Sequence, residues 1–101
     1  MFEGFIDYLS ALTLDIISGA DTIILNSVVN VNKAVPFIRG YKTINCYLDN
    51  DTAGQTVLSE LTAIYSLTVI DRSTLYSEFN DLNDYLVNQS FNKHKISNEN
   101  K

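Results

Sequence analysis

Leu48-Asp-Asn-Asp-Thr-Ala-Gly54 is the stretch that decides the predicted fold. An apolar, strand-like run over residues 44–48 leads into it, and a pattern typical of an amphipathic helix follows it. Because alternate residues at a strand end point the same way, Asp49 and Asp51 are expected to place two carboxylates on one side. Open α/β sheets keep their ligand sites at this edge, and two carboxylates with room for water and phosphate suit Mg²⁺. Gly54 lets the backbone turn tightly into the helix.

The same stretch also has a purely structural interpretation. Asp-Asn-Asp is ordinary turn chemistry, and an aspartate before a helix often serves as its N-cap. Both interpretations are open on these residues alone, so the rest of the chain has to separate them.

Composition limits the class of protein. The 101 residues are enough for one domain with a modest core, and 46% hydrophobic with 19% charged residues is typical of a globular chain. A net charge of −5 argues against a free-standing nucleic-acid binder, which normally has a basic face. One cysteine and one histidine exclude a disulfide framework or a Cys/His zinc cluster, and Cys46 is expected to be a buried, reduced thiol. With no transmembrane-length run and no signal peptide pattern, a cytoplasmic protein is expected.

Two helices are expected before the central strand. The first runs from Phe5 to near Gly19, and an apolar face at helical spacing consists of Phe5, Tyr8, Leu9 and Leu12. The second lies within residues 28–39, where Pro36 either delays its start or kinks it. Asn30 or Asn32 is expected to cap this second helix.

Two further helices are expected after the central strand. One covers residues 53–65, and its core face consists of Val57, Leu58, Leu61 and Ile64. The other covers residues 81–89 with Asp81 as its cap, and its inward side chains are Leu82, Tyr85 and Leu86.

Short apolar runs predict strands over residues 22–25, 43–48 and 67–70, with a loop over residues 73–80. Alternation of strands and helices implies an α/β fold, a Rossmann-like parallel sheet of about four strands with helices on both faces. Residues 1–3 alone represent the first strand, so we expect a truncated first strand in a fragment of a longer protein. The domain is expected over residues 1–89, followed by a polar, frayed tail over residues 90–101.

Acidic residues follow three of these strands. Glu3, next to Gly4, ends the first strand, Asp49 and Asp51 end the third, and an acidic segment from Asp81 to Asp84 follows the fourth. In a parallel sheet all of them fall at one edge, where their repulsion is costly unless a cation offsets it.

With these three motifs the chain resembles the Toprim family, the catalytic domain shared by topoisomerases and primases. The resemblance covers residues 2–86. The family signature is a glutamate-glycine pair, then Asp-x-Asp-x-x-Gly, then an acidic segment; here these are Glu3-Gly4, residues 49–54 and residues 81–84. The Ala-Gly of the second motif and the Asp-x-Asn-Asp of the third look similar to primases and primase-helicases of bacteria, phages and mobile elements.

The resemblance implies a role for each acidic residue. Glu3 would act as general acid or base, and Asp49 and Asp51 would hold Mg²⁺ or Mn²⁺. Asp81 and Asp84 would either complete the metal site through water or simply cap the last helix. A carboxylate near other carboxylates tends to have a raised pKa, which suits proton transfer near neutral pH. Gly4 and Gly54 would support the turns at the site.

The implied function is the Toprim domain of a DNA primase-like protein, which makes primers on DNA by Mg²⁺-dependent nucleotidyl transfer. The isolated fragment is expected to be inactive, with DNA and nucleotides held by other domains of the parent and a helicase as a candidate partner. The alternatives are a related nuclease or topoisomerase, and a catalytically idle domain for DNA docking or assembly. No nucleic-acid-binding residue is assigned, because the few basic side chains are best interpreted as solvated surface charges. The truncated strand also predicts self-association through the open sheet.

Overall fold

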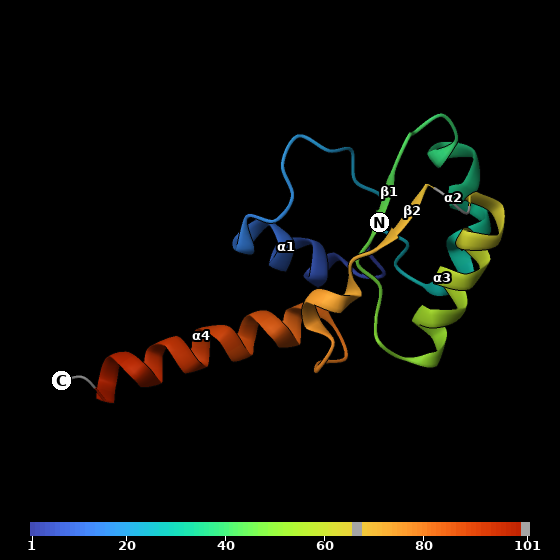
Figure 1. Cartoon of the computed structure of the whole chain (residues 1–101). Helices are drawn as coiled ribbons and strands as arrows, with labels where there is room; N and C mark the ends of the chain where they lie inside the picture. Colours follow the sequence, from blue (N-terminus) through green and yellow to red (C-terminus); the bar gives the residue numbers. More distant parts are fainter. Residues whose placement is uncertain (66–67, 100–101) are drawn as a thin grey trace.

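The computed structural model describes residues 1–65 and 68–99. Within them the chain forms four α-helices, two short 3₁₀ helices and two regular strands (Figure 1). In chain order these are α1 (Phe5–Leu14), η1 (Val28–Asn30), α2 (Val31–Ile38), β1 (Ile44–Cys46), α3 (Thr52–Tyr65), β2 (Val69–Asp71), η2 (Ser73–Tyr76) and α4 (Leu82–Glu99). None of the described helices combines the length and the hydropathy that crossing a bilayer requires.

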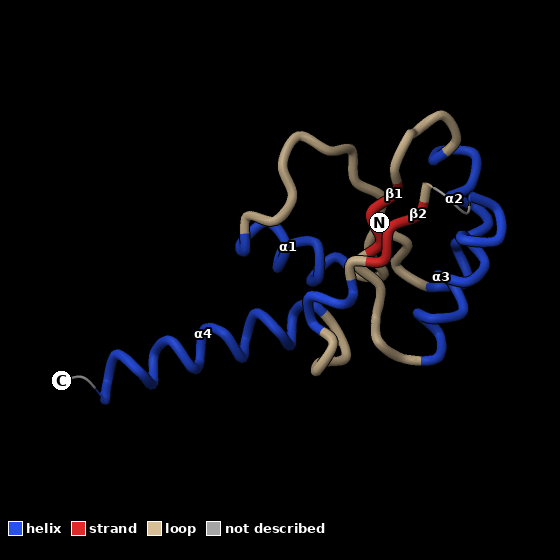
Figure 2. The backbone as a smooth tube through the Cα atoms, in the orientation of Figure 1, coloured by secondary structure: helices blue, strands red, loops and turns tan. Residues whose placement is uncertain are grey.

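The sheet is parallel, as predicted, but only two of its strands are regular in the described part of the chain. β1 pairs with β2, with Ile44 opposite Val69. Isolated parallel bridges join Phe2 to Ile24 on one side and to Tyr47 on the other. The N-terminal residues therefore lie between the predicted second and third strands, and four segments run side by side where four strands were expected (Figure 2).

Helices cover both faces of this sheet, with α2 and α3 on one side and α1 and the start of α4 on the other (Figure 1). Each face has its own core. The core beneath α2 and α3 includes Met1, Ile44, Cys46 and Leu61, and the core beneath α1 and α4 includes Phe2, Ala11, Tyr47, Tyr76 and Leu82. Because successive strand residues point to opposite faces, Met1 and Phe2 contribute to different cores. Cys46 is fully buried, as predicted, and burial raises the pKa of its thiol to about 11.

Helix α1 differs from its prediction in both length and orientation. It ends at Leu14 rather than near Gly19, because Asp15 takes a left-handed conformation and its N–H bonds back to the helix carbonyls. Phe5, Leu9 and Leu12 of the predicted core face are 54%, 40% and 48% exposed. Tyr8 of the predicted face is half-buried and packs against the core as expected. The rest of the inward face consists of Asp7, Ser10, Ala11 and the half-buried Leu14.

The remaining helices follow the predictions more closely. α3 buries Val57 and Leu61 as expected, but Ile64 is 56% exposed. In the second helix Pro36 is accommodated, and Asn30 is the N-cap; its side chain binds the carbonyl of Leu25 rather than the helix. The last helix begins as predicted but does not end at Gln89. No proline or glycine interrupts residues 90–99, and α4 continues to Glu99.

Two further expectations concern β2 and the segment after it. β2 begins at Val69, and residue 67, where the strand was expected to start, lies outside the described residues. The predicted loop over residues 73–80 opens with the helical turn η2.

Candidate active site

The turn after β1 is held in place by Asn50. Its backbone N–H donates to the carbonyl of Asn80 at 2.6 Å, and its side-chain amide donates to the carbonyls of Tyr76 and Phe79 at 3.0 and 2.9 Å. One residue thus ties the end of β1 to the segment that precedes α4. The second and third acidic motifs of the chain are therefore brought to the same edge, as the sequence predicted.

Gly54 supports this turn for a reason that differs from the predicted one. Its φ is not left-handed, so backbone freedom is not what requires glycine. A Cβ at residue 54 would lie 2.1 Å from the carbonyl oxygen of Asp49, so α3 can begin this close to β1 only with a glycine there. Gly4, in contrast, is the extended N-cap of α1, and a Cβ there would meet no atom within 4 Å.

Glu3 lies directly against the end of β1. Its Oε2 accepts the backbone N–H of Asp49 at 2.5 Å. This contact joins the short first strand to the central strand just beyond their last backbone bond, from Tyr47 to Met1. The structure thereby brings together Glu3 and Asp49, which are 46 residues apart in the chain.

The carboxyl group of Asp49 is the least satisfied polar group of the site. Its Oδ1 is buried and accepts no hydrogen bond among the described residues. The pKa of Asp49 is raised to about 7, mainly by burial and then by the nearby charges of Glu3, Asp7, Asp51 and Asp81, in that order. A bound cation would relieve both causes, because it replaces the lost solvation and offsets the neighbouring charges.

Asp7 belongs to the same cluster, and the sequence interpretation missed it. Its side chain is 9% exposed, and its Oδ1 accepts the N–H of Asn83 at 3.1 Å. Burial raises the pKa of Asp7 to about 6, with the charges of Asp81, Glu3 and Asp84 adding to the effect and the bond from Asn83 opposing it. The sequence does contain one indication of this position: Asp7 follows Glu3 by four residues, which places it on the first turn of α1, near Glu3.

Asp51, Asp81 and Asp84 have more ordinary surroundings. Asp51 is exposed, and its Oδ1 accepts the N–H of Gly54 at 2.8 Å, as an N-cap of α3 does. Asp81 accepts the N–H of Asp84 at 2.8 Å, which is the capping interaction that the sequence left open. Asp84 itself is exposed. All three carboxylates contribute charge to the cluster, and those of Asp51 and Asp81 also hold the turns around it.

The carboxylate oxygens of this site can be compared with the ligands that a divalent cation requires. The described residues hold no group of three or more acidic, cysteine or histidine side chains arranged as a ready-made metal site. Mg²⁺, however, is usually held by one or two carboxylates, with water and substrate phosphate as its other ligands. Glu3 and the unpaired Oδ1 of Asp49 place hard oxygen donors close together. These residues therefore fit a Mg²⁺ ion whose remaining ligands come from water and a substrate.

Comparison with known families agrees with this arrangement. A family model described as Toprim-like matches residues 1–86. No curated protein and no solved structure matches the chain significantly. The match to the family model contains every acidic residue of the predicted site, and it confirms the resemblance at the level of the family without separating its branches. The chain therefore belongs to the Toprim-like family.

Proposed function

We propose that this chain is the Toprim-like domain of a primase-like protein, and that it serves Mg²⁺-dependent nucleotidyl transfer in primer synthesis on DNA. Toprim domains generally bind Mg²⁺ and act on DNA, in nucleotidyl-transfer, nuclease and topoisomerase reactions. The observation that carries the proposal is the contact between Glu3 and the end of β1, beside the unsatisfied oxygen of Asp49. The primase-like form of the second and third acidic motifs favours primer synthesis over the other reactions.

Glu3 is proposed as the residue that moves the proton. The backbone N–H of Asp49 holds one of its oxygens and so orients the carboxylate toward the edge of the sheet. A general acid or base has to be within hydrogen-bond reach of the proton it transfers, and this orientation is what such a role requires.

Asp49 is proposed as the main metal ligand, with Asp51 beside it. When bound, Mg²⁺ would neutralise charge on the phosphate oxygens of the nucleotide. Asp49 offers a buried oxygen that lacks a hydrogen bond among the described residues. Asp51 has one oxygen on the N–H of Gly54, which leaves its other oxygen for a ligand or a bound water. Asp81 and Asp84 are proposed to act through water, if at all, since Asp81 already caps α4.

The proposed reaction also implies partners. The chain has a net charge of −5 and its acidic motifs meet at this edge, so DNA and nucleotides are proposed to be held by other domains of a parent protein. A helicase is a candidate partner of such a parent.

The test compares Glu3→Gln with Asp49→Asn in template-dependent primer synthesis on single-stranded DNA, using the parent protein across a range of Mg²⁺ and Mn²⁺. Glu3→Gln should lower turnover by a factor on the order of a hundred without being rescued by metal, as expected for lost acid–base catalysis. Asp49→Asn should lose activity that excess Mn²⁺ partly restores. Glu60→Gln, at an exposed position of α3, is the matched control and should be as active as the parent.

Three results would change the proposal. If Glu3→Gln kept full activity, or were rescued by Mn²⁺ as Asp49→Asn is, the role given to Glu3 would be wrong. Metal-dependent cleavage or relaxation of DNA without primer synthesis would identify a nuclease or topoisomerase instead. A parent that functions normally without these carboxylates would identify an idle docking domain.

A further inference from the structure

Asn50 makes contacts that ordinary turn chemistry does not explain. An asparagine in a turn usually bonds the backbone of its own neighbours. The half-buried side chain of Asn50 instead donates to the carbonyls of Tyr76 at 3.0 Å and Phe79 at 2.9 Å, which are 26 and 29 residues away along the chain. The carbonyl of Ser73 lies at the limit of hydrogen-bond range, at 3.5 Å. This asparagine therefore joins two segments of the fold rather than shaping one turn.

These contacts require an amide at position 50. A side-chain amide carries two N–H donors, which is enough for the two shorter bonds. The backbone N–H of the same residue donates to the carbonyl of Asn80 at 2.6 Å. An ionised carboxylate at this position could only accept hydrogen bonds, and it would face the carbonyls without a proton to share. Together the bonds from Asn50 to residues 76–80 form a clamp, the Asn50 clamp.

The Asn50 clamp acts on the segment that leads into the third acidic motif. Asp81 follows Asn80 directly, and α4 begins at Leu82. The negative charge of Asp81 is among the causes that raise the pKa of Asp49 and of Asp7, so this carboxylate lies near both. Like charges gathered in this way repel one another, and without a cation the repulsion favours moving residues 81–84 away from Asp49. The Asn50 clamp opposes that movement.

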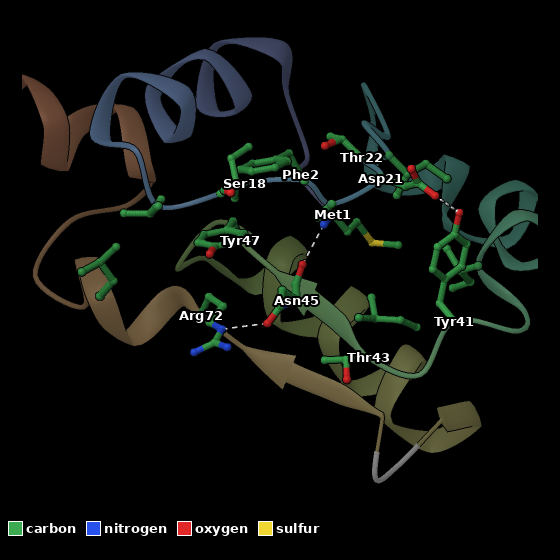
Figure 3. A pocket seen from close by; sticks show the side chains of 18 of the residues that line it. Met1, Phe2, Ser18, Asp21, Thr22, Tyr41, Thr43, Asn45, Tyr47 and Arg72 are labelled. Atoms are coloured by element: carbon green, nitrogen blue, oxygen red, sulfur yellow. Dashed lines mark hydrogen bonds between the residues drawn. The ribbon is translucent and has the colours of Figure 1, made fainter.

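A second asparagine of the same segment offers a comparison. Asn45 is also half-buried, and its side-chain oxygen accepts Nε of Arg72 at 2.8 Å (Figure 3). That bond joins β1 to the residue after β2 and does not involve residues 76–84. The two side chains therefore have the same chemistry, but only that of Asn50 holds the segment before the third acidic motif.

We propose that Asn50 is a positioning residue of the metal site: the Asn50 clamp holds the acidic segment 81–84 against Asp49, so that metal binding and the clamp stabilise each other. The effect is reciprocal, because a clamp that strengthens metal binding must itself be strengthened by bound metal. The role requires no contact between Asn50 and the metal, since the side chain acts through backbone carbonyls. The inference rests on the proposed Mg²⁺ site at Asp49 and adds the residue that fixes its geometry.

The first test measures Mn²⁺ affinity from the relaxation of water protons in solutions of the 101-residue chain. Asn50→Ala should weaken binding by about tenfold or more, the usual effect of removing a residue that orients a metal ligand. Asn50→Ser, which keeps one donor, should bind with an intermediate affinity. Asn45→Ala is the matched control and should bind as tightly as the unsubstituted chain.

A further variant tests whether loosening of the segment is enough to weaken binding. Tyr76→Phe removes the 2.7 Å bond from the Tyr76 hydroxyl to the carbonyl of Leu48 and leaves the Asn50 clamp in place. It should lower the midpoint of urea unfolding without weakening Mn²⁺ binding.

The second test needs no substitution and follows amide hydrogen exchange with and without saturating Mg²⁺, under conditions in which local opening dominates. Exchange at the backbone N–H of Asn50, which bonds Asn80, should slow by the factor by which Asn50→Ala weakens binding, about tenfold. The N–H of Tyr41 donates to Ile38 in the turn before β1, at the opposite end of this strand from Asp49. It is the control, and its exchange rate should not change.

The possible outcomes separate this inference from the proposed function. If Asp49→Asn binds Mn²⁺ as tightly as the unsubstituted chain, the proposed metal site fails and this inference fails with it. If Asp49→Asn loses binding while Asn50→Ala keeps it, or if Mg²⁺ leaves exchange at Asn50 unchanged, only the role of Asn50 is overturned. It is also overturned if Tyr76→Phe weakens binding as much as Asn50→Ala does. Should Asn50→Ala fail to fold, the exchange measurement on the unsubstituted chain decides.

Discussion

Gly54→Ala is the substitution whose effect follows most directly from the structure. The added Cβ would lie 2.1 Å from the carbonyl oxygen of Asp49 and 2.9 Å from its carbonyl carbon. Real Cβ atoms essentially never come closer than 3.0 Å, so by difference α3 or residue 49 has to move by about 0.9 Å. The neighbour is backbone, held by the bond from its N–H to Glu3, and cannot rotate away as a side chain could.

The cost has two opposing parts. Overpacking of this kind destabilises by about 1–3 kcal/mol, and an immobile carbonyl places it at the upper end. Alanine in a helix gains about 1 kcal/mol over glycine. The net expectation is a loss of about 2 kcal/mol in the free energy of unfolding, which for a chain of this size lowers Tm by roughly 8–16 °C.

Urea unfolding of Gly54→Ala beside Gly4→Ala measures this effect with a matched control. Gly4 has an extended backbone with φ −130°, and its Cβ would meet nothing within 4 Å. Gly4→Ala should therefore cost only the penalty of an alanine at a helix N-cap, no more than about 1 kcal/mol. If the two variants were equally stable, the close approach of residue 54 to Asp49 would not exist in solution, and the account of the turn would fail.

Three further predictions concern the acidic edge. The pKa of Asp49 is raised from 3.8 to about 7, and that of Asp7 from 3.8 to about 6. The contribution of these two groups to the free energy of unfolding should therefore be greatest below about pH 4 and should fall as the pH rises to about 7. In urea unfolding measured across this pH range, Asp7→Asn should make the fall less steep. Mg²⁺ or Mn²⁺ should raise Tm at pH 7, and Asp49→Asn should abolish the rise while the exposed Asp15→Asn does not. Tyr76→Phe should cost about 1–2 kcal/mol, because the carbonyl of Leu48 loses its 2.7 Å bond from the buried hydroxyl; an unchanged urea midpoint would contradict that bond.

The parts of the fold that the sequence predicted well are those in which pattern and packing agree. Val57 and Leu61 mark the buried face of α3, and the alternation of strands and helices predicted the parallel pairing. The convergence of Glu3 and Asp49 followed from topology alone, because parallel strands end at one edge.

Helix α1 shows why the rest could not be predicted. Its most apolar stripe, which contains Phe5 and Leu9, is largely exposed, and its buried stripe contains Asp7 and Ser10. A periodicity argument ranks the stripes by hydrophobicity and so chooses the wrong one. Asp7 is buried because Asn83 of α4 donates to it, and Ser10 also contacts Asn83. Such a pairing across 76 residues leaves no local signal. Helix α4 extends further than its composition predicts, because residues 90–99 are polar but contain no helix breaker.

The hydrogen bonds at the acidic edge also distinguish carboxylates that cap helices from carboxylates that are free to bind a metal ion or a substrate. Asp51 and Asp81 each accept a backbone N–H at the start of a helix, so the fold alone gives a reason for an aspartate at both positions. Asp49 differs, because its buried Oδ1 accepts nothing from the described residues and its pKa is raised. A buried, unsatisfied carboxyl beside other acids destabilises the fold, and its presence is explained if a cation and a substrate satisfy it. The proposed roles in metal binding and proton transfer therefore rest first on Asp49 and on Glu3 beside it, and only second on the two capping aspartates.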